Sequence, residues 1–190
     1  MRTGDQIFLD LGCSFAQDIR GLVADGIDSR QCYGVDLQLD FLELGYELFR
    51  DRETLQTKFI AADIFDPKGA LDELEGKVDI MGTFSFFHLF SWDEQKKVAQ
   101  QILKLLKPVS GSLLVGRQVG AREPTEQQRK EGSGSRYRHN MESWRRFWKE
   151  VGEEAGVTLQ VDGVEDSMPK SYKNALSYGD MVLQFSVRRM

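Results

Sequence analysis

The stretch QIFLDLGCSFA at residues 6–16 decides the fold. Its apolar run, residues 7–11, is bounded by glycines and is typical of a buried strand. Small residues at positions 12–16 then turn the chain into an amphipathic segment. Because small side chains leave the backbone amides of such a turn uncovered, a ligand can approach the turn and the start of the next helix closely. The stretch therefore predicts a strand, a ligand-binding turn and a helix.

A carboxylate ends the second apolar run, CYGVD at residues 32–36. Nucleotide-binding sheets place an acid about 20 residues after the first turn, at the end of the second strand, where it binds ribose hydroxyls. The two oxygens of Asp36 match two adjacent hydroxyl groups. An exposed acid at a strand end is the alternative. We expect a ligand that carries a ribose.

Strands and helices alternate along the rest of the chain. The last two strands are joined by a polar segment that contains Pro169 and Gly179, and Pro67 breaks the chain earlier. The pattern predicts an α/β fold with a doubly wound, seven-stranded, mostly parallel, Rossmann-like sheet and an antiparallel last strand. The expected helices cover residues 16–24, 39–49, 71–74, a segment from Ser91 with Glu94 as its capping partner, and a segment from Asn140 or Ser143; the further strands cover 58–62, 78–87, 112–119, 157–164 and 181–187.

The length of 190 residues suits a single domain over residues 1–190. Residues 121–139 are charged and interrupted by proline, glycine and serine, which predicts a mobile loop that is either a functional lid or disordered. We expect the basic run of Arg136, Arg138 and His139 beside this loop to be solvated. Trp144 and Trp148 follow at helical spacing, which favours a place in the core.

Composition limits the partners of the chain. The net charge of -5 and the pI near 5.2 argue against a broad electrostatic grip on nucleic acid. No apolar run approaches the roughly 20 residues that span a bilayer, and residue 1 is not followed by a signal-peptide pattern. Cys13 and Cys32 are expected as buried thiols, and no cluster has the spacing of metal ligands. We expect a cytoplasmic protein with a small-molecule substrate, without nucleic acid, membrane or metal.

The glycine fingerprint of dinucleotide-binding proteins, G-x-G-x-x-G, is absent. Instead, the pattern D-L-G-C-x-x-A after a strand resembles motif I of the class I S-adenosylmethionine-dependent methyltransferases. Three further motifs follow in the order of that family. They are Asp36 as the acid of motif II, the run AADIF at residues 61–65 and LKP at residues 106–108. The resemblance implies the class I methyltransferase fold and S-adenosylmethionine as the cofactor.

Longer blocks resemble the fungal secondary-metabolite methyltransferases of meroterpenoid pathways, among them FLDLGCSFAQDIRGLVADG, FFHLFSWDEQKKVAQQILKLLKP and RHNMESWRRFWKEVGEEAG. Those enzymes methylate a carboxyl group of a polyketide-terpenoid intermediate, so the resemblance, from Phe8 to about Gly156, implies O-methylation of a natural-product carboxyl group. Such proteins carry helices before the first strand, whereas here that strand begins close to Met1. We expect a shortened chain or a lid supplied from elsewhere, and an uncovered apolar patch that favours a homodimer.

The cofactor-binding prediction combines the residues with the resemblance. Asp10 would accept hydrogen bonds near the methionine part of the cofactor, Leu37 would flank the adenine, and Asp63 would accept from the adenine amino group. A turn-capping role is the alternative for the two acids, and a core role is the alternative for Phe84 and Phe86. The complete predicted set is Asp10, Gly12, Cys13, Ser14, Asp36, Leu37, Asp63, Ile64, Phe84 and Ser85.

The acceptor side is predicted at the exit of the fourth strand. Phe86 and Phe87 would line the substrate passage, and Arg117 could pair with a substrate carboxylate, with a surface arginine as the alternative. His88 is the catalytic candidate, because it could donate to a carboxylate or take a proton from a hydroxyl or amine; a packed histidine is the alternative. Methyl transfer from a sulfonium needs mainly alignment, and a carboxylate acceptor needs no base.

Three other functions compete with carboxyl methylation. Methylation of a hydroxyl or nitrogen would make His88 a base, with a rate that falls below its pKa. A methyltransferase-like binding or scaffold domain would keep the fold without turnover. A nicotinamide dehydrogenase is disfavoured, because the third glycine and a Tyr/Lys proton relay are missing.

Overall fold

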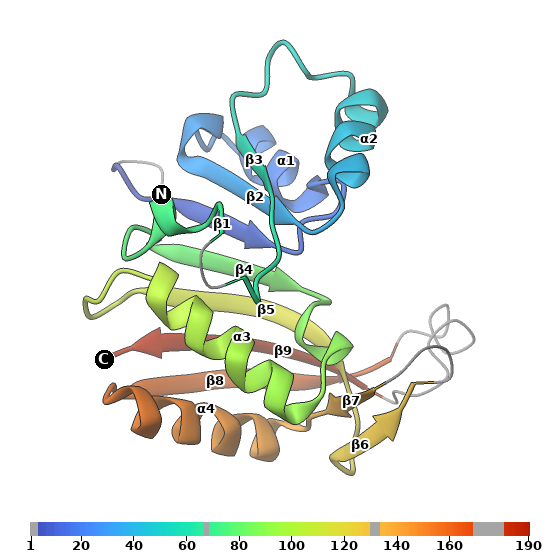
Figure 1. Cartoon of the computed structure of the whole chain (residues 1–190), viewed down its shortest axis with the longest axis vertical. Coiled ribbons are helices and arrows are strands. Elements are labelled where there is room, and N and C mark those ends of the chain that lie inside the picture. Colours follow the sequence, from blue (N-terminus) through green and yellow to red (C-terminus); the bar gives the residue numbers. More distant parts are fainter. Residues whose placement is uncertain (1–3, 67–68, 130–133, 169–180) are drawn as a thin grey trace. The chain divides into compact units, whose positions relative to one another are not determined.

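Seven strands form one sheet in the computed structural model, which describes residues 4–66, 69–129, 134–168 and 181–190. The order is β3-β2-β1-β4-β5-β9-β8 (Figure 1). β1 pairs in parallel with β2 and β4, and β2 with β3, whereas β9 runs antiparallel to both β5 and β8. The predicted seven-stranded, mostly parallel sheet with an antiparallel last strand is confirmed. The strands are β1 Phe8–Leu11, β2 Cys32–Asp36, β3 Lys58–Ala61, β4 Ile80–Phe84, β5 Leu113–Gly120, β8 Leu159–Ser167 and β9 Met181–Arg189.

The helices begin where the sequence carries capping residues. Ser91 and Glu94 form the predicted reciprocal pair, with Ser91 N donating to Glu94 Oε2 at 2.8 Å and Glu94 N to Ser91 Oγ at 3.3 Å. Asn140 caps the last helix, and Ser143 completes its capping box. The helices are α1 Gln17–Ala24, α2 Leu39–Phe49, α3 Trp92–Leu105 and α4 Met141–Ala155, with short 3-10 turns η1 Ser29–Gln31, η2 Asp72–Leu74 and η3 Phe87–Leu89.

The chain divides into two compact units, and the first comprises residues 1–84 and 101–108. Its core buries the inner faces of α1 and α2, for example Ile19 and Leu42. Gly45 lets α2 approach the turn after β1, because a Cβ there would lie 2.9 Å from the carbonyl oxygen of Phe15. The same turn is held by Arg20, which donates to that carbonyl at 2.6 Å. The helices thus hold the predicted ligand-binding turn in place.

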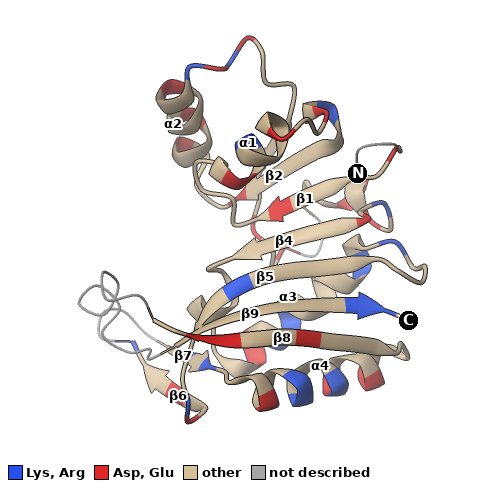
Figure 2. Ribbon diagram, turned by 180° about the vertical axis from the view of Figure 1, so that it is seen from behind, with Lys and Arg blue, Asp and Glu red and all other residues tan. Residues whose placement is uncertain are grey.

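The second unit comprises residues 85–100 and 109–190. The apolar stripe of α4 is fully buried, as predicted for Trp144 and Trp148. The ring of Trp144 stacks on Phe147 and contacts Phe185 of β9 at 4.7 Å between centroids. The charged residues of α4, coloured along its ribbon in Figure 2, are exposed apart from the half-buried Glu150. Aromatic burial therefore fixes α4 against the antiparallel strands.

A hairpin occupies much of the segment in which we expected a loop. β6 Thr125–Gln128 and β7 Ser135–Arg138 pair antiparallel within residues 121–139. The expected solvation of the basic run is wrong for Arg138 and His139, which are 2% and 1% exposed. Arg138 ends β7 and donates to the carbonyl oxygen of His88, while the ring of His139 is hydrogen-bonded to Ser143 and Gln95. Pro67, Pro169 and Gly179 lie outside the described residues.

The two cysteines, Cys13 and Cys32, are buried free thiols, as predicted. Burial raises the pKa of both thiols, that of Cys32 to about 11. Among the described helices, none is both long and apolar enough to cross a bilayer.

Candidate functional site

The turn after β1 alternates left-handed residues. Gly12, Ser14 and Ala16 have φ angles of 76°, 51° and 53°. The amides of Gly12 and Cys13 both donate to the carbonyl oxygen of Val35, at 2.8 and 3.0 Å. In a glycine-rich turn, glycines would stand at positions 14 and 16 as well as at position 12. Ser14 and Ala16 therefore adopt a conformation that favours glycine, at a cost of about 1 kcal/mol each. The predicted tight turn is present and locked to β2.

Asp36 ends β2 beside this turn. Its Oδ2 accepts the backbone N–H of Ser14 at 2.8 Å, and its Oδ1 accepts that of Gln38 at 3.0 Å. Each carboxylate oxygen can accept a second hydrogen bond, so two acceptor positions remain. Leu37 follows it and is 62% exposed. The arrangement fits a ribose diol with an exposed apolar side chain beside it.

Asp10 is a buried carboxyl group without a hydrogen-bond partner. It is 1% exposed, and neither side-chain oxygen is bonded. Its neighbours on β2 and β4 are both glycines, Gly34 and Gly82, and the rings of Phe59 and Phe84 fill the space that a Cβ on them would need. Burial, with smaller contributions from the charges of Asp18 and Asp36, raises the pKa of Asp10 to about 8.

The unpartnered carboxyl group and the free lone pairs of Asp36 provide a test of fit for S-adenosylmethionine. The cofactor carries an ammonium group and a ribose diol, which are the chemical partners that Asp10 and Asp36 lack. Low local dielectric makes an unpaired buried carboxyl costly, and a cationic group would remove that cost. The residues present therefore fit the cofactor.

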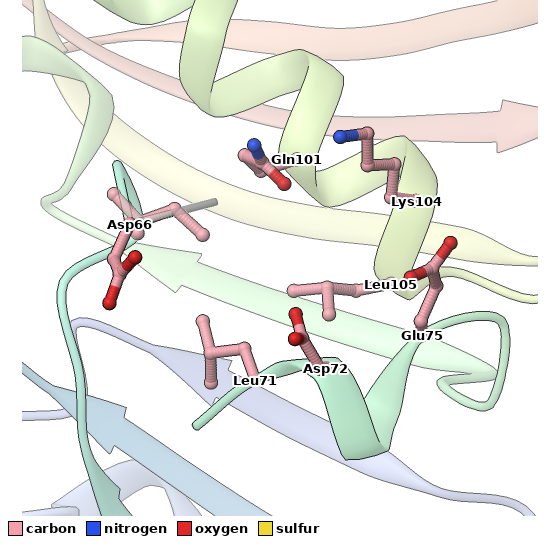
Figure 3. A pocket seen from close by; sticks show the side chains of 8 residues that line it. Asp66, Leu71, Asp72, Glu75, Gln101, Lys104 and Leu105 are labelled. Carbon is pink, nitrogen blue, oxygen red and sulfur yellow. The ribbon is translucent and has the colours of Figure 1, made fainter. Parts of the chain in front are cut away.

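The two residues predicted on the adenine side, Asp63 and Ile64, differ in exposure. Asp63 is exposed, and its Oδ1 accepts the backbone N–H of Phe65 at 2.9 Å, which is a turn contact. Ile64 is buried and lines a cavity of about 40 Å³ within the first unit. Figure 3 shows this cavity with Asp66, Leu71 and Gln101 among its labelled side chains. The structure thus leaves Asp63 open to a ligand and packs Ile64 inside. The cavity is lined by Ile64, Asp66, Leu71, Asp72, Glu75, Gln101, Lys104 and Leu105.

The phenylalanines at the end of β4 differ in burial. Phe84 is part of the apolar cluster of the first unit. Phe87 belongs to the second unit, is 1% exposed, and contacts Trp144 at 5.0 Å between ring centroids. Phe86 is half-buried and lies 5.1 Å from the ring of Phe90. Phe87 therefore lies in the core, whereas Phe86 keeps part of its ring accessible.

Ser85 adopts a left-handed conformation where β4 ends. Its φ is 64°, and its N–H donates to the carbonyl oxygen of Arg117 at 2.8 Å. Left-handed serines cost about 1 kcal/mol or more and cluster at functional sites. The side chain of Arg117 is exposed. The structure brings the two residues together through their backbones.

His88 is buried and neutral. It is 6% exposed, and its Nδ1 accepts the N–H of Val119 at 3.4 Å. Burial, with smaller contributions from the charges of Arg138 and Arg136, lowers the pKa of His88 to about 3. The geometry leaves Nε2 as the protonated nitrogen. A neutral histidine with a low pKa suits hydrogen-bond donation and is a weak proton acceptor at pH 7.

Hydrogen bonds that the sequence did not predict hold the segment at residues 88–90. Three consecutive carbonyl groups, those of residues 88, 89 and 90, accept hydrogen bonds from the hairpin. Arg138 Nη1 donates to the first at 3.2 Å, Arg129 Nη2 to the second at 2.7 Å, and the N–H of Tyr137 to the third at 2.8 Å. The one signal was the arginine-rich composition of residues 129–138. The hairpin thus fixes the segment that carries His88.

A match of the methyltransferase domain family to residues 8–109 identifies this arrangement. The chain belongs to the methyltransferase domain family. The match covers β1 to the end of α3, so the turn, Asp10, Asp36 and Asp63 of this methyltransferase domain all lie within it. The cofactor is S-adenosylmethionine, as predicted.

Two curated relatives align with nearly the whole chain. O-methyltransferase phiE from a fungus recorded as Fungal sp. is 43% identical over 94% of this chain and 60% of its own length. Asnovolin E/Chermesin D methyltransferase nvfJ from Aspergillus novofumigatus is 38% identical over 96% of this chain and 65% of its own length. The chain therefore spans less than two thirds of these relatives.

A solved structure confirms the fold of the methyltransferase domain. The 1,6-didemethyltoxoflavin-N1-methyltransferase of Burkholderia thailandensis superposes with a TM-score of 0.65, at 16% identity, over 97% of this chain and 71% of that one. At this identity the likeness concerns the fold alone. It agrees with the strand order described above.

Proposed function

We propose that this chain methylates a carboxyl oxygen of a small natural-product intermediate. The observation that carries the proposal is the state of His88, the single titratable side chain of the segment SFFHLF at residues 85–90. A pKa of about 3 makes it a weak base at neutral pH, and a carboxylate is the acceptor that needs no base. The printed names of phiE and nvfJ, an O-methyltransferase and a methyltransferase of asnovolin E and chermesin D, agree with such a substrate.

Each residue has a part in this proposal. S-adenosylmethionine supplies an electrophilic methyl group when it is bound. Asp36 would hold the ribose hydroxyls, Asp10 the ammonium group, and Asp63 the adenine amino group. Gly12, Cys13 and Ser14 would contact the cofactor through their backbone, with Leu37 beside the adenine, while Ser85 and Phe86 would align the acceptor and exclude water.

The neutral His88 would act as a hydrogen-bond donor. Its Nε2–H can stabilise the carboxylate oxygen that does not react, which orients the other oxygen toward the methyl group. The same geometry disfavours a hydroxyl or amine acceptor, because deprotonation of those groups would need a base with a pKa near 7. We expect the reaction to take place in the cytoplasm and residues 1–190 to act as a single methyltransferase domain.

Tritium-labelled S-adenosylmethionine tests the acceptor class directly. The chain is incubated with the acidic fraction of a fungal metabolite extract, and the product is treated with alkali. A methyl ester releases volatile labelled methanol, which is the expected result. Label that stays non-volatile, as in an ether or an N-methyl group, would contradict carboxyl methylation, and failure of the folded chain to bind S-adenosylhomocysteine would contradict the cofactor site.

A further inference from the structure

Arg138 is a buried arginine at the end of β7. Its side chain is 2% exposed, and Nη1 donates to the carbonyl oxygen of His88 at 3.2 Å. Its Nε lies in the interior without a hydrogen-bond partner. Arginines are seldom fully buried unless a carboxylate or phosphate pairs with them. The environment of Arg138 therefore needs an explanation.

No counterion balances the charge of Arg138 within the part of the chain that the structure describes. None of the ion pairs there includes Arg138. The charged group that acts on it is another cation, Arg136; together with burial it lowers the pKa of Arg138 to about 10, so the guanidinium stays charged at pH 7. A buried cation without a counterion destabilises the ligand-free chain.

The position of Arg138 connects it to the acceptor side. Its partner His88 also accepts the N–H of Val119, and the preceding residue, Gln118, is 2% exposed with both amide atoms unpartnered. Arg138 Nε and Gln118 Nε2 are thus buried donors without acceptors, and Gln118 Oε1 is a buried acceptor without a donor. All of these residues belong to the second unit. The buried guanidinium of Arg138, with its unpaired Nε–H and no counterion among the described residues, is complementary to an anion.

We propose that Arg138 binds the carboxylate of the methyl acceptor, an inference that rests on the proposed function. The free Nε edge of a guanidinium matches the planar carboxylate group, and burial strengthens the pairing. Because the ligand-free side chain is enclosed, the acceptor enters by displacing contacts of the hairpin. This assigns acceptor recognition to Arg138 rather than to the exposed Arg117.

The pairing also has a consequence for release. One carboxylate oxygen would form a bond to the methyl carbon while the carbon–sulfur bond breaks. The electron pair of the broken carbon–sulfur bond stays on sulfur. The products are a neutral ester and a neutral thioether, so no proton is transferred. The ester no longer carries the charge that Arg138 binds, and product affinity falls.

Binding of benzoate and benzamide tests the proposal with probes of nearly equal shape. Both are titrated calorimetrically into the chain saturated with S-adenosylhomocysteine. We expect the parent to bind benzoate at least tenfold more tightly than benzamide, Arg138→Gln to lose this preference, and Arg138→Lys to retain part of it. Arg145→Gln, at an exposed position of α4, is the matched control and keeps the preference.

Three results overturn the proposal: equal or absent binding of the two probes by the parent, a preserved preference in Arg138→Gln, or a preference lost in Arg117→Gln instead. Thermal unfolding separates recognition from a structural role. Removal of an uncompensated charge should leave the melting temperature of ligand-free Arg138→Gln unchanged or raised, whereas a structural arginine would lower it by several degrees. A parent that binds S-adenosylhomocysteine without preferring benzoate defeats this inference alone, and a parent that binds no S-adenosylhomocysteine defeats the proposed function.

Discussion

The backbone N–H of Ser14 donates a 2.8 Å hydrogen bond to Oδ2 of Asp36, which joins the turn after β1 to the acid at the end of β2. Two motifs that lie 22 residues apart in the sequence therefore form one unit. A ligand that binds Asp36 meets a turn whose conformation Asp36 itself stabilises. Cofactor affinity and turn stability are coupled at this carboxylate.

Replacing Asp36 by Asn should weaken binding of S-adenosylhomocysteine about 10- to 100-fold, because hydrogen bonds to a charged acceptor are stronger than those to an amide. The change is measured by calorimetric titration of the folded chain. Asp40→Asn is the matched control, an exposed acid in the first turn of α2, and should bind as the parent does. Equal affinity in Asp36→Asn would argue against a ribose contact.

The pKa of Asp10 predicts a pH dependence of stability. Since the folded pKa of about 8 lies above the ordinary value of 3.8, the folded chain holds a proton that the unfolded chain has lost. The free energy of unfolding should therefore fall as the pH rises from about 4 to 8. Asp10→Asn should lessen this fall in urea titrations across that range. An unchanged slope in the variant would assign the dependence to another group.

Cofactor binding should release a proton from Asp10 at neutral pH. A cationic ammonium beside the carboxyl group favours its ionised form and lowers the raised pKa. Calorimetric titrations with S-adenosylhomocysteine in buffers of different ionisation enthalpy report the number of protons released. We expect release in the parent and none in Asp10→Asn, and equal release in the two would place the ammonium elsewhere.

Replacing Ser14 by Gly should stabilise the chain by up to about 1 kcal/mol, because glycine adopts the left-handed φ of 51° at this position without strain. The greater conformational freedom of glycine in the unfolded chain offsets part of this gain. Gly12→Ala, at a φ of 76°, should have the opposite effect. The free energies of unfolding in urea provide the comparison. A destabilised Ser14→Gly would show that the serine side chain contributes more than the strain costs.

Removing the charge of Arg20 should destabilise the first unit by about 2–3 kcal/mol, as expected for hydrogen bonds to charged groups. Arg20 pairs with Asp51 at 2.7 Å, with the two side chains 9% and 20% exposed, and also holds the carbonyl group of Phe15. Arg20→Gln should therefore also weaken cofactor binding. Arg30→Gln, which breaks an exposed pair with Asp28, should leave stability unchanged.

Local patterns were sufficient for much of the fold. The apolar run before Gly12 predicted β1, and the spacing in residues 39–49 predicted α2 with its observed bounds. Ser91 and Asn140 marked helix starts because a capping side chain acts within three residues of its own position. The hairpin was missed because charged residues of low apolar content carry no clear period, and because its contacts are with η3, which is distant in sequence.

The sequence by itself determined the sheet, the turn and the position of Asp36, because strand period, small turn residues and strand-end acids are local properties. The tertiary structure alone decided the state of the buried charges. Burial raises the pKa of Asp10, which lies between two strands whose facing glycines are covered by phenylalanine rings, and Arg138 is enclosed because the hairpin packs over η3. Desolvation depends on every group that surrounds a side chain, and those groups come from distant parts of the chain.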